Sequence, residues 1–229
     1  MKKENNKGVG ILFIIGVVAL LIISIVNVYA LSSLSNNMGF SGSKFAGGKD
    51  IANVDLTSIH STGQAVATLF PVDKIKTQQE AIDVLVPSGT PEYGEALGIS
   101  FDDPVGGENK LAKLYPQIKN EAKQDPVLWQ RYMNLATKPV GISCEFCCGI
   151  GPIGIDGSGE LKCGCAHNPA IQALTMWLMK NTDYSDAEIL REDLKWKTLW
   201  FPKGMIELGL KAAGGEINLN DLPGQVGGC

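Results

Sequence analysis

The sequence has few of the residues and motifs on which common enzymes depend. Its 229 residues include only two histidines, His60 and His167, and contain no G-x-S-x-G or H-E-x-x-H motif and no complete phosphate-binding loop. A Ser-His-Asp hydrolase and a P-loop nucleotidase are therefore not expected. No run of lysine or arginine occurs either, so nucleic acid is not an expected partner.

Cysteine is absent from the first 143 residues and then abundant. The stretch "CEFCCGIGPIGIDGSGELKCGCAHNP", residues 144–169, contains five of the six cysteines together with His167. The five are Cys144, Cys147, Cys148, Cys163 and Cys165. The sixth, Cys229, is the last residue and follows two glycines. Its pliable arm would allow the thiol to reach the other five, but an exposed thiol or an intermolecular disulfide is an equally good interpretation.

Charged residues are missing from residues 8–31, in which Asn27 is the only strongly polar residue. About 20 apolar residues suffice to cross a bilayer, so residues 1–31 are expected to form a cytoplasmic tail and a transmembrane anchor. A cleaved signal peptide is the alternative. Because Lys2, Lys3 and Lys7 precede the apolar run, we expect a single-pass protein of the cell membrane with its C-terminal domain outside the cytoplasm.

The remainder of the chain reads as a linker followed by a helical domain. Residues 32–49 are rich in Ser, Gly and Asn and predict a flexible linker. Residues 50–229 carry two capping boxes, at 77–80 and 185–188, and Asp125-Pro126 as a further helix start, whereas Pro116 is expected to kink or break its helix. The expected fold class is mainly α, with a single N-terminal transmembrane helix and an extracytoplasmic helical domain. A cysteine-rich β-hairpin or loop is inserted in that domain.

The hairpin is predicted from the glycines between the two cysteine groups. Asp156-Gly157 lies between Ile155 and Leu161, a pattern typical of a tight hairpin turn. Such a turn would bring the cysteines before it close to those after it. Gly157 and Gly159 are both expected to need a positive φ, and Asn168 is expected to cap the helix that follows.

Three kinds of chemistry suit the clustered thiols. Thiolate and imidazole ligands favour zinc, copper or an iron–sulfur cluster, and the available ligands exceed the four that one tetrahedral ion needs. The predicted metal ligands are Cys144, Cys147, Cys148, Cys163, Cys165, His167 and Cys229. Thiol–disulfide exchange at Cys144-x-x-Cys147 is the second possibility, and disulfides that only stabilise the fold are the third.

The motif "CGCAH", followed by a helix and by "SDAEIL", resembles exported, membrane-attached proteins named for a PCYCGC motif. The resemblance covers about Cys144 to Trp200 and implies that Cys163, Cys165 and His167 are the functional residues. It implies metal binding but names no reaction. This chain differs because a glycine-rich segment separates "CEFCC" from "CGC" and because it has no lipid-anchoring cysteine near its N-terminus.

These patterns together predict a membrane-anchored, extracytoplasmic protein that binds a thiophilic metal for capture, delivery or sensing. A membrane-tethered thiol oxidoreductase and a disulfide-stabilised interaction module are the alternatives. The sequence names no protein partner.

Overall fold

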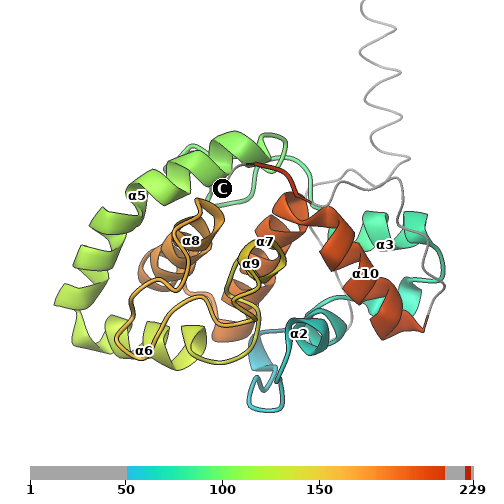
Figure 1. Cartoon of the computed structure of the whole chain (residues 1–229), viewed down its shortest axis with the longest axis horizontal. Helices are drawn as coiled ribbons and strands as arrows, with labels where there is room; N and C mark the ends of the chain where they lie inside the picture. The colour runs from blue at the N-terminus through green and yellow to red at the C-terminus, as the bar shows by residue number, and fades with distance from the viewer. Residues whose placement is uncertain (1–50, 215–224, 228–229) are drawn as a thin grey trace, which may run out of the picture. The chain divides into compact units, whose positions relative to one another are not determined.

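The structure is a computed structural model that describes residues 51–214 and 225–227, all of which belong to the unit Ala46–Cys229 (Figure 1). The described residues form α-helices joined by loops and two short 3-10 helices, η1 (Ile51–Asn53) and η2 (Val72–Lys74). The α-helices are α2 (Thr62–Leu69), α3 (Gln78–Leu85), α4 (Gly94–Leu97), α5 (Pro104–Gln124), α6 (Pro126–Ala136), α7 (Glu145–Cys148), α8 (His167–Asn181), α9 (Asp186–Trp200) and α10 (Pro202–Ala213).

Helix α8 lies at the centre of the core. It packs against α5, α6 and α9, while α10 packs against α2, α3 and α9 (Figure 1). Most of its residues are buried, including polar ones such as Gln172 and Thr175. A helix that is buried on all sides must be apolar or internally hydrogen-bonded all round, and α8 fits this description. Its first residue, His167, is thereby held in the interior.

The helix starts follow the predicted capping chemistry. Thr77 and Ser185 each accept a hydrogen bond from the backbone N–H three residues on, and both capping boxes are complete. Asp125 accepts from the first N–H groups of α6. The predicted break at Pro116 does not occur, because the 21-residue α5 continues through this residue. The buried side chains of Leu111, Tyr115 and Ile118 lie on both sides of Pro116, and packing of α5 on α8 offsets the lost hydrogen bond.

The predicted fold class has to be corrected with respect to the membrane. Within residues 51–214 and 225–227 no helix is both long and apolar enough to span a bilayer. Helix α8 is apolar but has only 15 residues, and the 21-residue α5 carries lysines and glutamates. Residues 8–31, for which the anchor was predicted, lie outside the described part. The described residues therefore form a mainly helical unit, and none of its helices is a membrane span.

The predicted chain reversal between Ile155 and Leu161 is confirmed, but it has no regular β-strands. The described residues contain no β-strand, and the cysteine-rich stretch has only two isolated bridges, Ile142 with Ile153 and Ile155 with Leu161. The Asp156 side chain supports the turn, because its Oδ1 accepts from the backbone N–H groups of Ser158 (2.8 Å) and Glu160 (3.0 Å). Backbone hydrogen bonds from the Asp156 N–H to the Glu160 carbonyl (2.9 Å) and from the Lys162 N–H to the Gly154 carbonyl (2.9 Å) join its two sides, so the chain reverses at the predicted place.

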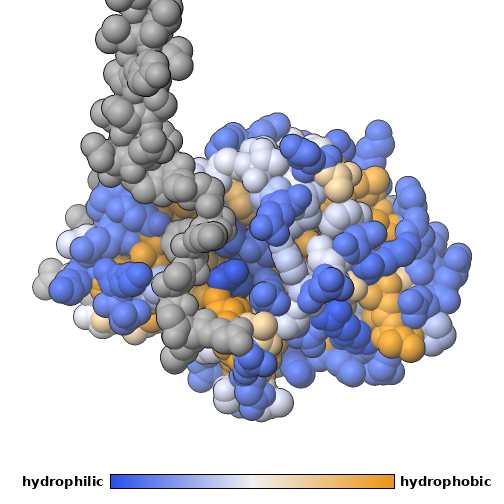
Figure 2. Space-filling view, turned by 180° about the vertical axis from the view of Figure 1, so that it is seen from behind, coloured by the Kyte–Doolittle hydropathy of each residue, from blue (hydrophilic) through white to orange (hydrophobic). Residues whose placement is uncertain are grey.

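The surface of this unit is mainly polar. Figure 2 shows hydrophilic residues over much of the described surface on one face, with hydrophobic residues in small groups. Among the described residues, the large hydrophobic side chains that are exposed are Val105, Val127 and Phe146. Phe146 lies on α7, within the cysteine-rich stretch.

Only one of the two turn glycines requires its special conformation. Gly159 has φ +81°, and a Cβ there would lie 2.6 Å from the Trp129 ring. Gly157 has no positive φ and has nothing within 4 Å of an added Cβ, so the prediction was wrong for this residue. The turn therefore depends on Gly159 for both its backbone angle and its packing.

We expect Gly159→Ala to lower the free energy of unfolding by about 2 kcal/mol, because a left-handed conformation and a steric clash would both be imposed on alanine. Gly157→Ala is the matched control and should change it by less than about 0.5 kcal/mol. Urea denaturation followed by circular dichroism would measure both. Equal effects of the two substitutions would contradict the assignment of the turn.

Candidate metal centre

Four cysteines from two parts of the chain meet in one place. The Sγ atoms of Cys144, Cys148, Cys163 and Cys165 all lie within 4.8 Å of one another. We call these four residues the four-cysteine site. Cys144 caps α7 and Cys148 ends it, whereas Cys163 and Cys165 lie in the loop before α8. From α7 the group takes Cys144 and Cys148, which are four residues apart, and not Cys147.

Cys147 belongs to a second group of potential ligands. A ligand atom from each of Cys147, Cys165 and His167 lies within 4.8 Å of the other two. Cys147 is disulfide-bonded, whereas the other four cysteines of the stretch are free. The Cys148 Sγ lies 3.6 Å from the Cys147 Sγ. Cys229, the remaining predicted ligand, lies outside the described residues.

His167 is buried, with 1% of its surface exposed, and only one of its ring nitrogens is hydrogen-bonded. Its Nε2 lies 3.0 Å from the carbonyl oxygen of Val226. A carbonyl can only accept, so Nε2 donates and carries a proton. The ring packs against Phe201 and Trp200, with centroid distances of 4.6 and 5.7 Å. Nδ1 has no hydrogen-bond partner and is therefore available as a ligand.

Glu108 stands behind His167 and could not be recognised from the sequence. Its Oε1 lies 3.4 Å from His167 Nε2, and it is 1% exposed, with no hydrogen bond to either oxygen. Burial raises its pKa, and His167 opposes that shift. Gly227, at φ +89°, packs so tightly here that an added Cβ would collide with Glu108 Oε2. The pattern of α5 gives no sign that this glutamate faces inward toward a residue 59 positions away.

The thiols of the four-cysteine site differ in pKa. Hydrogen bonding from Cys144 lowers the pKa of Cys165 well below its usual value, against the effect of burial, and His167 and the Asn168 backbone N–H add to the shift. The pKa of Cys144 is raised, chiefly by the same contact and by burial. Cys165 is thus the thiolate of the group, and the first turn of α8 favours its negative charge.

The residues around the thiolates have roles other than those predicted. Helix α8 begins at His167 after Ala166, so Asn168 is not its cap. The Asn168 side chain instead donates to the carbonyl oxygens of Gly154 (2.8 Å) and Cys163 (3.2 Å). These bonds hold the loop that carries Cys163 against α8.

A buried ion pair between Lys197 and Glu145 holds α7 against α9. The Nζ of Lys197, on α9, donates to Glu145 Oε1 (2.7 Å) and to the carbonyl oxygen of Gly141 (2.7 Å). The Lys197 side chain is wholly buried, and burial lowers its pKa although Glu145 opposes this. The lysine therefore holds both ends of the segment that leads into α7, next to Cys144.

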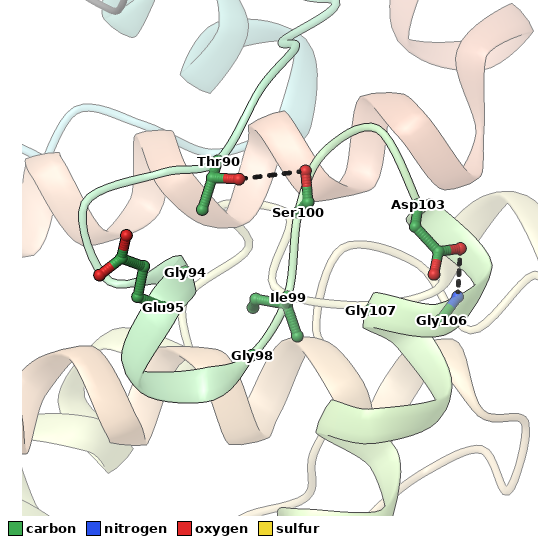
Figure 3. A pocket seen from close by; sticks show the side chains of 9 residues that line it. All are labelled: Thr90, Gly94, Glu95, Gly98, Ile99, Ser100, Asp103, Gly106 and Gly107. Carbon is green, nitrogen blue, oxygen red and sulfur yellow. Dashed lines mark hydrogen bonds between the residues drawn. The ribbon is translucent and has the colours of Figure 1, made fainter.

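A pocket away from the cysteines offers less chemistry. It lies between α4 and the start of α5 and is lined by Gly94, Gly98, Gly106 and Gly107 among others (Figure 3). Its main polar groups are already engaged, because Asp103 accepts from the Gly106 N–H (2.9 Å) and Ser100 donates to the Gly89 carbonyl (3.0 Å). The cysteine-rich stretch is the better candidate for the functional site.

Comparison with known proteins finds no matching family model, no matching curated protein and no matching solved structure. The resemblance to PCYCGC-motif proteins therefore stays a prediction. What the structure itself establishes is that a group of four cysteines, and a group of two cysteines and a histidine, could each hold a metal ion.

We expect Glu145→Gln to lower the free energy of unfolding by about 3 kcal/mol, because it leaves the buried Lys197 ammonium without its counter-charge. Glu207→Gln, which breaks the exposed pair with Lys211, is the control and should cost less than about 1 kcal/mol. Thermal and urea denaturation would measure both variants. Similar small losses would show that the ion pair does not anchor α7.

Proposed function

We propose that the chain binds a thiophilic metal ion through Cys144, Cys148, Cys163 and Cys165. The observation that carries this proposal is the mutual approach of four free Sγ atoms to within 4.8 Å. In a tetrahedral site with Zn–S bonds of about 2.3 Å, the sulfur atoms stand about 3.8 Å apart, which such a cluster can reach with small side-chain movements. Capture, delivery or sensing of the metal would be its role.

The free state of these thiols supports metal binding over a purely stabilising set of disulfides. Four cysteines that only cross-link a fold would be paired with distant parts of the chain, since a disulfide stabilises most when it closes a long loop. These four instead face one another from the short helix α7 and from the loop before α8. Cys144 and Cys165 are buried and Cys148 is exposed, so the group has a fixed inner side and an open outer side.

The spacing favours one ion over a cluster. In a [4Fe–4S] cluster each cysteine binds a different iron, and in a [2Fe–2S] cluster the four cysteines are divided between two irons, so the set of thiolates spreads further than around a single centre. All four sulfurs lie close enough here to surround one ion. Zinc, and Cu(I) as a second thiophilic ion, are the candidates that this arrangement suits.

Thiol–disulfide exchange is a second candidate, because a disulfide-bonded Cys147 lies beside the exposed thiol of Cys148. Its weakness is the state of that thiol. The pKa of Cys148 is raised to about 11, chiefly by hydrogen bonding with Cys163, so little attacking thiolate would be present near neutral pH. The metal proposal needs no such thiolate in advance, because the ion displaces the protons as it binds.

We expect the purified full chain, treated with a chelator and then with Zn²⁺ without oxygen, to bind zinc through the four-cysteine site. Cys148→Ser and Cys163→Ser should each weaken this binding by more than the roughly 10–100-fold that loss of a residue supporting a ligand costs. Competition with a chromophoric chelator would give the affinities. His60→Ala, which removes an exposed imidazole far from any cysteine in sequence, is the control and should retain the parent affinity.

Zinc affinity that is unchanged in both cysteine variants would contradict the proposal. Disulfide exchange with a dithiol substrate that is abolished by Cys148→Ser and is insensitive to zinc would favour the second candidate instead.

A further inference from the structure

We propose that Cys147, Cys165 and His167 form a second metal site, which shares the Cys165 thiolate with the four-cysteine site and opens when the disulfide of Cys147 is reduced. A ligand atom from each of the three residues lies within 4.8 Å of the others. The inference rests on the proposed function in that Cys165 belongs to both groups. It adds a second ion, an imidazole ligand and the requirement that the disulfide of Cys147 be reduced.

The orientation of His167 is the first support. Its Nε2 proton is directed to the Val226 carbonyl, which leaves the Nδ1 lone pair for another partner. Nδ1 is buried and makes no hydrogen bond. A buried nitrogen without a partner is unfavourable in a well-packed interior, and a metal ion held with Cys147 and Cys165 would satisfy it.

Glu108 supplies the second support. Histidine ligands of metal ions commonly donate their other ring N–H to a carbonyl or a carboxylate, which fixes the ring and makes the ligand more basic. His167 Nε2 donates to the Val226 carbonyl at 3.0 Å, and Glu108 Oε1 lies 3.4 Å from the same nitrogen as an acidic neighbour. The carboxylate has no hydrogen-bond partner of its own, so the positive charge of a bound ion would compensate its burial. Glu108 is a positioning residue for this site.

The two sites differ in the number of protein ligands that they offer. The four-cysteine site offers four thiolates and can close around an ion, as structural zinc sites do. The second site offers three protein ligands and leaves a coordination position open, as sites that exchange or activate a ligand do. With a shared thiolate, two divalent ions would balance most of the charge of the five thiolates. The second ion is therefore the one suited to transfer.

The disulfide of Cys147 determines whether the second site can bind an ion. While the Cys147 sulfur is bonded to another sulfur it cannot serve as a thiolate ligand. A dithiol breaks the S–S bond by giving two electrons and two protons to the two sulfurs, and is itself oxidised to a disulfide. Cys147 then loses its proton when the ion binds. By count the sixth cysteine of the chain is Cys229, and Cys229→Ser tests whether it is the partner.

The test counts zinc per chain on the full protein, as isolated and after dithiothreitol treatment followed by anaerobic removal of the reductant. We expect one ion in the oxidised chain and two in the reduced chain. Cys147→Ser should bind one ion in either state, and His167→Ala should bind one after reduction. In Glu108→Gln the second ion should bind about 10–100-fold more weakly while the affinity of the first is retained, which a general loss of folding would not produce.

The possible failures are distinguishable. One ion in both redox states would reject the second site and leave the proposed function standing, whereas no ion in either state would reject both. Two ions in the oxidised chain would reject the redox condition. Substituting Co²⁺ for zinc adds a spectrum in which loss of the imidazole by His167→Ala should shift the bands of the second ion alone.

Discussion

The candidate site depends on the ion pair between Lys197 and Glu145. The Cys144–Cys148 segment is short, flanked by loops and ended by Gly149 in a left-handed conformation, so it has little stability of its own. Lys197 ties it to α9, which is part of the core, by donating to both Glu145 and Gly141. A buried ammonium is costly unless it is paired, and this cost fixes where α7 can lie. Cys144 and Cys148 consequently face the loop before α8.

The other half of the site is fixed from α8. His167 begins that helix inside the core, and the Val226 carbonyl and Glu108 hold its outer nitrogen. Asn168, one residue on, binds the backbone of the loop that carries Cys163. The two halves therefore come from rigid helices, although the cysteines themselves lie on short loops and a single helical turn. Such support from regular elements is what allows a ligand set to be held before any ion is bound.

The sequence predicts the local features of this structure well and the long-range ones poorly. The capping boxes at Thr77 and Ser185 and the convergence of the cysteines follow from residues close together in the chain. The helical turn of α7 was not predicted, because glycines lie close to it in the sequence. The chain reversal at Asp156 was predicted, and it pairs Ile155 with Leu161 by an isolated bridge rather than by regular strands. Glu108 and Lys197 were missed because the groups that they face are distant in sequence, and no local pattern marks a charged residue as buried.

The unequal exposure of the ligands gives the site a direction. Cys144, Cys165 and His167 are buried and form its inner wall, whereas Cys148 is exposed and Cys147 and Cys163 are partly so. An incoming ion would therefore meet the outer thiols first and would reach Cys165, the residue common to both groups, last. A shared inner thiolate with separate outer ligands means that occupation of one position alters the charge felt at the other, because both ions draw on the same sulfur. Under the proposal, binding at the two positions would be coupled through Cys165, and the redox state of Cys147 would decide whether this thiolate serves one ion or two.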